Sequence, residues 1–156
     1  MGQCWTKKVD NWGFAAVSKT FKTKTKNNYD DEDVCKELAS GNVHLITTIH
    51  QWEEKISEAY RDAKIVVVNF SASWCSPCRT IATAYIELAN RYTWMMFLTV
   101  DVDELAEFCS KWDIKATPTF FFLKNGQEVD RLVGANKVDL QEKTMAIAES
   151  NKRSTK

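Results

Sequence analysis

Hydrophobic residues gather in short runs along residues 42–150, and amphipathic stretches separate these runs. The segment 64–70, KIVVVNF, is a continuous apolar run rich in β-branched residues, which is typical of a strand buried on both faces. Further strand-like runs lie at 42–47 and 94–102, and two more are joined by Asn125-Gly126, a strong hairpin signal. The pattern predicts a sheet with 64–70 as its central strand.

The amphipathic stretches have apolar residues at helical spacing. In the first stretch, Trp52, Ile56 and Ala59 form one stripe, and Thr48 with Gln51 fits a capping box at its start. The predicted helices cover 50–63, 79–92, 104–112 and 137–150. Strands that alternate with helices and end in an antiparallel hairpin predict an α/β fold, with a mixed sheet covered by helices on both faces.

The first 41 residues have a different composition from the rest of the chain. Six lysines lie between Lys7 and Lys26 against a single acid, and an acidic run follows at 30–33. This segregation of charge predicts a flexible extension. A chain of 156 residues suits one domain with tails, so we expect an extension at 1–41, a folded domain at 42–150 and a basic tail at 151–156.

Overall charge and cysteine usage narrow the class of protein. Lysine plus arginine equals aspartate plus glutamate at 21 each, so no excess of charge indicates a nucleic-acid partner. No apolar run is long enough to span a bilayer, and the N-terminus lacks the apolar stretch of a secretory signal. The five cysteines are irregularly spaced, unlike a secreted disulfide scaffold, so we expect a reducing, cytoplasmic compartment.

Two cysteines, Cys75 and Cys78, directly follow the predicted central strand in the sequence WCSPC. We expect Cys75 at the start of the next helix, where free backbone N–H groups and the helix dipole favour an anion. Thiols in such settings have pKa values of about 3.5 to 7.5, against about 8.5 for a free thiol. Cys78, one turn later and less exposed, would resolve a mixed disulfide formed at Cys75. Pro77 suits the first helical turn.

Other interpretations of this pair stay open. A CxxC pair can be half of a zinc site, but the chain has no second CxxC, and His44 and His50 have no recognisable ligand spacing. The pair could also be two unreactive core cysteines, since free cysteine is often buried. The neighbouring Trp74, the proline and the position between strand and helix favour redox chemistry.

Three segments, 66–78, 101–126 and 132–137, together resemble thioredoxins, and specifically the plant h-type. The resemblance extends over about residues 43–150. It implies a five-stranded mixed sheet flanked by four helices, the thioredoxin fold, and a protein-disulfide reductase with no bound cofactor that works through a redox-active Cys75–Cys78 disulfide. It also implies a cis peptide bond between Thr117 and Pro118, facing the cysteine pair.

The same resemblance implies a substrate groove beside the reactive sulfur. Its lining would be Trp74, Thr117, Pro118, Gly134 and Ala135, and the client backbone would pair with the edge around Thr117. Both residue types also have ordinary structural uses. Trp74 could simply pack against the core, and Gly134 could form a turn at the end of a strand.

Three positions depart from the family pattern. Ser76 replaces the usual glycine between the cysteines. In this family the two residues between the cysteines tune the reduction potential of the pair. Asn69 replaces a buried aspartate that helps to move the proton during resolution, and Thr99 replaces the lysine next to it. Because the aspartate and the lysine are both replaced, neither charged side chain is buried without its partner. An amide cannot act as a general base, so we expect slower resolution than in an aspartate-bearing relative.

The N-terminal sequence MGQCWT fits a lipidation pattern. Gly2 would accept myristate, Thr6 supplies the required hydroxyl position, and Cys4 stands where palmitate is commonly added. One h-type subgroup carries this Met-Gly-x-Cys start. Chance occurrence of so short a pattern and an organelle transit peptide are the alternatives. We expect a protein peripheral to the plasma membrane or an endomembrane if it is acylated.

The expected partners follow from the family resemblance. They are disulfide-containing client proteins, with a thioredoxin reductase or glutathione and glutaredoxin as reductant, and we expect a monomer. Two alternatives remain: a binding or signalling module with weakened redox turnover, and a disulfide isomerase or oxidase. The remaining Cys35 and Cys109 are expected to be spectators, because nothing in the sequence around them indicates a lowered pKa.

Overall fold

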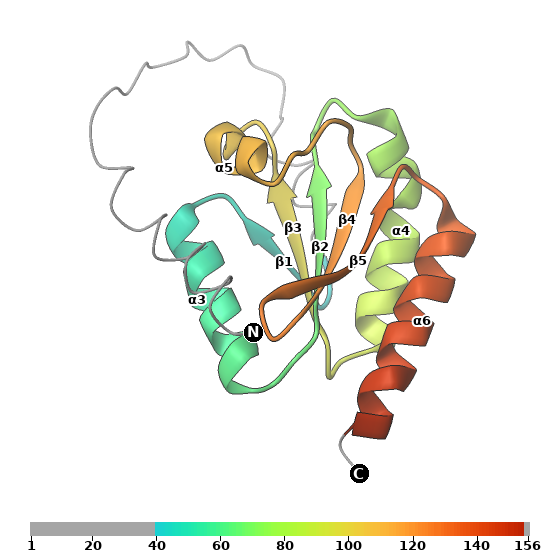
Figure 1. Ribbon diagram of the computed structural model, residues 1–156. Helices are drawn as coiled ribbons and strands as arrows, with labels where there is room; N and C mark the ends of the chain where they lie inside the picture. Colours follow the sequence, from blue (N-terminus) through green and yellow to red (C-terminus); the bar gives the residue numbers. More distant parts are fainter. Residues whose placement is uncertain (1–39, 155–156) are drawn as a thin grey trace. The chain divides into compact units, whose positions relative to one another are not determined.

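A five-stranded sheet organises residues 40–154, the part of the chain that the computed structural model describes (Figure 1). The spatial order is β1-β3-β2-β4-β5, with the fully buried β2 at the centre. Strands β1, β3 and β2 are parallel, β4 pairs antiparallel with β2, and β5 pairs antiparallel with β4. The strands are β1 Val43–Ile46, β2 Val66–Ser71, β3 Met96–Asp101, β4 Thr119–Lys124 and β5 Gln127–Val133.

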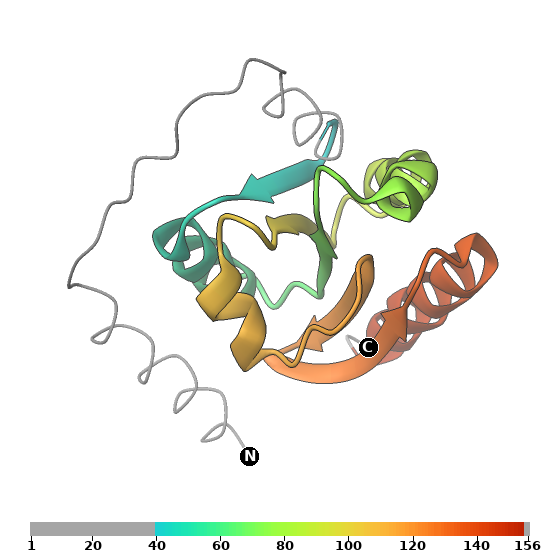
Figure 2. The ribbon, with the colours of Figure 1, turned by 90° about the horizontal axis from the view of Figure 1, so that it is seen from above.

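Four helices in the described range cover the two faces of this sheet (Figure 2). Helices α4 and α6 lie side by side on one face, and α3 and α5 lie on the other. The helices are α3 Ile49–Arg61, α4 Ser76–Arg91, α5 Ala106–Lys111 and α6 Lys137–Ser154. This arrangement is the thioredoxin fold, as expected from the sequence.

Each face of the sheet has its own core. Beneath α4 and α6, the hydroxyl of the fully buried Tyr85 reaches the carbonyl oxygens of Val67 at 3.0 Å and Leu98 at 2.7 Å, which ties α4 to β2 and β3. On the other face, aromatic rings from α3, α5 and the sheet pack edge to face, including Trp52 against Phe108 at 4.9 Å. The central strand β2 lies between the two cores, and a short loop connects its end at Ser71 to the cysteine pair.

Several local predictions are confirmed. The N–H of Gln51 donates to Thr48 Oγ1 at 3.2 Å, and the N–H of Thr48 donates to Gln51 Oε1 at 3.2 Å, which completes the capping box of α3. Asn125 and Gly126 both have positive φ, 51° and 72°, as the tight turn between β4 and β5 requires.

The last helix extends beyond its predicted end at residue 150. Residues 151–154, assigned to the basic tail, form the last turn of α6. The ammonium group of Lys152 lies 4.6 Å from the centre of the Trp94 ring, and this cation–π contact helps to hold the turn in place. Within residues 40–154, no helix combines the length and apolar character that crossing a bilayer requires.

Candidate active site

The loop after β2 places Cys75 at the N-terminus of α4. Cys75 is the N-cap residue with extended backbone angles, φ −84° and ψ 105°, and its carbonyl oxygen accepts from the N–H of Arg79 at 3.3 Å. Pro77 lies in the first turn, where its missing N–H leaves no helical bond unmade. The predicted position of Cys75 at the leading end of the helix is therefore confirmed.

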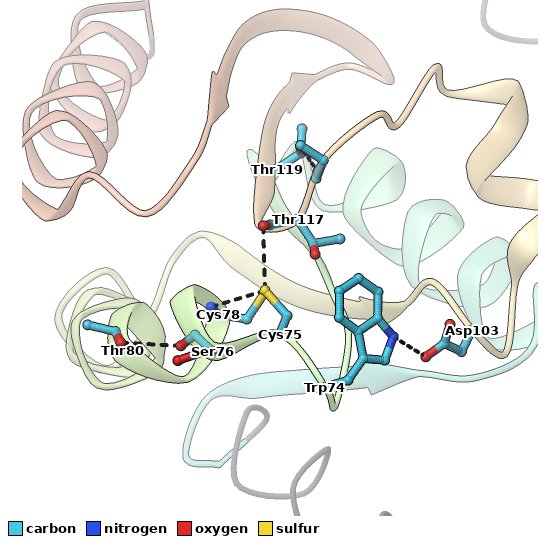
Figure 3. Close-up of a disulfide and its surroundings, with 9 residues drawn as sticks. Trp74, Cys75, Ser76, Cys78, Thr80, Asp103, Thr117 and Thr119 are labelled. Atoms are coloured by element: carbon cyan, nitrogen blue, oxygen red, sulfur yellow. Dashed lines mark hydrogen bonds between the residues drawn. A yellow bond between two sulfur atoms is a disulfide. The ribbon is translucent and has the colours of Figure 1, made fainter.

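A disulfide joins Cys75 to Cys78 (Figure 3). The N–H of Cys78 donates to Cys75 Sγ at 3.3 Å, so a helical amide faces the first sulfur. Cys75 is 3% exposed and Cys78 is fully buried inside α4. Ser76, the residue that departs from the family pattern, is exposed, and its carbonyl oxygen accepts from the Thr80 hydroxyl at 3.2 Å.

The loop before β4 faces the disulfide from the other side (Figure 3). The Thr117–Pro118 peptide bond is cis, as expected, and the carbonyl oxygen of Thr117 lies 3.5 Å from Cys75 Sγ. The N–H of Gly134 donates to the Pro118 carbonyl oxygen at 2.9 Å, which brings the end of β5 to the same place. Ala135 follows in an exposed position.

Gly134 has a φ of 96°, which side chains rarely tolerate, and a Cβ at this position would meet no atom within 4 Å. The backbone angle is the only structural demand for glycine here. The positive φ agrees with the interpretation of Gly134 as a turn residue at the end of a strand. Substrate binding by Gly134 and Ala135 stays a prediction.

The side chain of Trp74 is 65% exposed, so ordinary core packing does not explain it. Its Nε1–H donates to Asp103 Oδ2 at 2.9 Å, and the N–H of Asp103 donates to Asp101 Oδ1 at 2.9 Å. These two aspartates, at and just beyond the end of β3, fix the indole beside the disulfide. They were not predicted as site residues. The available signal was their position at the carboxyl end of a parallel strand, where binding loops gather.

A pocket of about 290 Å³ opens beside Trp74 and Thr117, between α5 and the loop that precedes β4. Its lining is mostly apolar and consists of Trp74, Val102, Ala106, Cys109, Ser110, Ile114, Lys115, Ala116 and Thr117. Two predicted groove residues therefore line it, and Pro118, Gly134 and Ala135 do not.

Cys109 lines this pocket but has an inert thiol. It is 5% exposed, and burial, followed by the charges of Asp101 and Asp103, raises its pKa to about 12. A neutral, buried thiol is a poor nucleophile, which supports the spectator interpretation. Cys35 lies outside the described residues.

Asn69 and Thr99 face each other across β2 and β3 and are 0% and 1% exposed. Neither amide atom of Asn69 makes a hydrogen bond, and the buried hydroxyl of Ser71, two residues on, also makes none. Asn69 and Ser71 share the sheet face of Val67, which packs against α4, because side chains alternate along a strand. The active-site helix therefore covers an uncharged polar pair where the family usually has a carboxylate.

A family model described as Thioredoxin matches residues 43–146. The chain belongs to the thioredoxin family. It is 58% identical to a Populus jackii protein named Thioredoxin H-type and to Thioredoxin H9 of Arabidopsis thaliana, each over 127 residues that cover 81% of this chain and 91% of the relative. The crystal structure of a poplar wild-type thioredoxin h has 63% sequence identity and a TM-score of 0.68, and the match covers 69% of this chain and 96% of that one.

This thioredoxin is a thiol-disulfide oxidoreductase that uses its own cysteine pair and no bound cofactor. Within residues 40–154, no cluster of three or more histidine, cysteine or acidic side chains is arranged to hold a metal ion. Membership of the family implies disulfide-containing targets. It also implies a thioredoxin reductase, which reduces the oxidised cysteine pair again.

The geometry suits the predicted order of the two thiols in this thioredoxin. In the reduced form, the Cys75 thiolate attacks one client sulfur, a mixed disulfide forms and the other client sulfur leaves as a thiolate. Cys78 then loses its proton and attacks Cys75 Sγ, which forms the Cys75–Cys78 bond and releases the second client thiolate. The dithiol supplies two electrons to the client. Cys75 faces the groove loop, whereas Cys78 is enclosed, so only Cys75 is placed to meet a client.

Proposed function

We propose that this thioredoxin reduces client proteins at a cytoplasmic membrane surface, to which acyl groups on Gly2 and Cys4 attach it. The observation that carries this proposal is the start of the chain, MGQCWT, which joins a myristoylation pattern to a neighbouring cysteine. Both acceptor residues lie outside the described residues.

Stable attachment to a membrane needs more than the myristoyl group on Gly2. A single myristoyl chain binds a bilayer only marginally, so a second acyl chain or a basic segment is needed for stable attachment. The chain offers both, since Cys4 follows Gly2 closely and six lysines occupy residues 7–26. Each lysine near an anionic leaflet adds about 1 kcal/mol.

The test is the distribution of the full chain between membrane and soluble fractions in plant cells. We expect the parent in the membrane fraction, Gly2→Ala in the soluble fraction, and Cys4→Ser in an intermediate position because its myristate alone holds weakly. Cys35→Ser is the matched control, since it removes a cysteine of the same region but outside the pattern. A Gly2→Ala protein that fractionates with membranes as well as the parent does would exclude the anchor.

A second function, a partner-binding module with slow redox turnover, is favoured by one observation. Asn69 is a neutral amide at the position where the family usually has a proton-transferring aspartate, and its neighbour Thr99 carries no charge. Turnover on a generic protein disulfide, measured with thioredoxin reductase and separately with glutathione and glutaredoxin, decides between the two and identifies the reductant. Negligible turnover with both, together with client binding that survives Cys75→Ser, would support the module. A strongly oxidising potential of the cysteine pair would instead indicate an oxidase or isomerase.

A further inference from the structure

Exposed aromatic and basic side chains gather at the end of the domain opposite the disulfide. Trp94 follows the C-terminal end of α4, is 42% exposed and contacts the Tyr92 ring edge to face at 5.3 Å. Lys152, in the last turn of α6, lies over the Trp94 ring, and Arg153 follows it. We call Arg91, Tyr92, Trp94, Lys152 and Arg153 the Trp94 surface.

The length of α4 separates this surface from the redox site. The helix has 16 residues from Ser76 to Arg91. At 1.5 Å per residue it spans roughly 24 Å, with Cys75 at its first end and the Trp94 surface at its last. Figure 1 shows the same polarity, with the loop from β2 to α4 at the upper end and the C-terminal ends of α4 and α6 at the lower end.

The N-terminal segment joins the domain beside the Trp94 surface. The N–H of Asn42 donates to Asn90 Oδ1 at 3.3 Å, two residues before Tyr92. Val43 pairs with Phe97, which places the start of β1 next to the strand that follows Trp94. Gly2, Cys4 and the lysines of residues 7–26 are thus connected to the domain at this end.

A tether alone does not orient the domain on a membrane. The 37 residues from Cys4 to Ser40 could span at most about 130 Å when extended, far more than the length of α4, so attachment at Gly2 does not by itself set an orientation. A surface feature is needed to select one. Tryptophan and tyrosine concentrate at membrane–water interfaces, where the ring is buried and the polar edge stays wet, and lysine and arginine bind anionic headgroups.

We propose that the Trp94 surface docks on an anionic lipid bilayer and holds the disulfide end towards the cytosol. This inference builds on the proposed membrane function and adds to it the docking face and the lipid class. Tyr60, 63% exposed in the last turn of α3, lies at the same end of the sheet and would approach the same plane. Glu87 and Glu149, which lie one turn back from the ends of α4 and α6, weaken the basic character of this end of the domain.

The test uses the unacylated full chain and sedimentation with vesicles of phosphatidylcholine, with or without phosphatidylserine. Without acyl groups, the result does not depend on whether Gly2 and Cys4 are modified in cells. We expect the parent to bind vesicles that contain phosphatidylserine, and Trp94→Ser to bind about tenfold more weakly because it loses the buried indole. Replacing Arg91, Lys152 and Arg153 together by glutamine should weaken binding further, by up to about fivefold per charge.

Val138→Ser is the matched control, because Val138 is an apolar side chain, 59% exposed, at the other end of α6. It should bind like the parent. Trp94→Ser and the glutamine variant lose the cation–π contact at the last turn of α6, so we expect a slightly lower unfolding temperature, and a cooperative thermal transition shows that each variant is folded. The proposal is overturned if the parent does not bind these vesicles, or if Trp94→Ser binds as tightly as the parent, since the extension alone would then account for attachment. The Gly2→Ala experiment in cells tests the lipid anchor alone. Its outcome does not affect the comparison of vesicle binding between the parent and Trp94→Ser.

Discussion

An aspartate at position 69 would place a carboxyl group where the residue opposite offers no charge to pair with. Asn69 is fully buried in the central strand, neither of its amide atoms is hydrogen-bonded, and the residue opposite is the neutral Thr99. A carboxyl group in such surroundings keeps its proton up to neutral pH, because burial raises its pKa far above the value of about 3.9 in the unfolded chain. Asn69→Asp therefore tests whether this site is dry.

The sign of the pH dependence follows from the raised pKa. Above the unfolded value, the unfolded chain ionises while the folded protein stays protonated, so the variant loses stability as pH rises. Each pH unit costs about 1.36 kcal/mol, which gives roughly 4 kcal/mol at pH 7 and less than half of that at pH 5. This loss is a large fraction of a typical domain stability of about 5–15 kcal/mol.

Denaturant unfolding of the oxidised proteins at pH 5 and pH 7 measures this loss. We expect the gap between parent and Asn69→Asp to widen by about 2.7 kcal/mol over that interval. Asn69→Leu, similar in shape and uncharged, should show no such widening, and adding Thr99→Lys to the aspartate should recover much of the loss. An Asn69→Asp protein whose deficit is the same at both pH values would show that water or another group solvates the carboxylate, and our description of the site would be wrong.

Three further predictions concern groups around the site and on α3. Asp103→Ala removes the acceptor of the Trp74 indole, and we expect kcat/KM for a client disulfide to fall about three- to tenfold with stability nearly unchanged; an unaltered kcat/KM would refute this role for the hydrogen bond. Cys109→Ser should leave that rate unchanged, and Cys109 in the folded protein should resist alkylation at pH 8 because its pKa is about 12; rapid labelling would contradict the inert thiol. The hydrogen bond from Lys55 lowers the pKa of Glu58 below 4.5, so Glu58→Gln should cost less than about 1 kcal/mol at neutral pH, and this difference should vanish as pH falls below that pKa.

Periodicity was sufficient to predict the sheet and its helices, because the signals are local. The apolar run of 64–70 and the turn at Asn125-Gly126 each depend on neighbouring residues only. The position of Cys75 at the start of a helix was predictable for the same reason. The cis bond and the groove came from the family resemblance instead.

Other features depend on contacts between residues distant in the chain. The hydrogen bond from Trp74 to Asp103 spans 29 positions, and no local pattern indicates it. The last turn of α6 contacts Trp94, far away in the sequence, so its polar residues resembled a tail. The raised pKa of Cys109 likewise depends on the tertiary fold, first through burial and then through the charges of Asp101 and Asp103.

The central claim is that backbone amides at the start of α4 stabilise a thiolate at Cys75. The Cys78 N–H that faces Cys75 Sγ supports it, whereas the Thr117 carbonyl oxygen, at 3.5 Å, would favour the protonated thiol. The pKa of Cys75 reports which of these two contacts has the larger effect. It is measured from the rate of Cys75 alkylation in the reduced protein at a series of pH values, by mass spectrometry of the labelled peptide. If the amides stabilise the thiolate, the midpoint lies clearly below the value of about 8.5 for a free thiol. A midpoint at or above that value would contradict it.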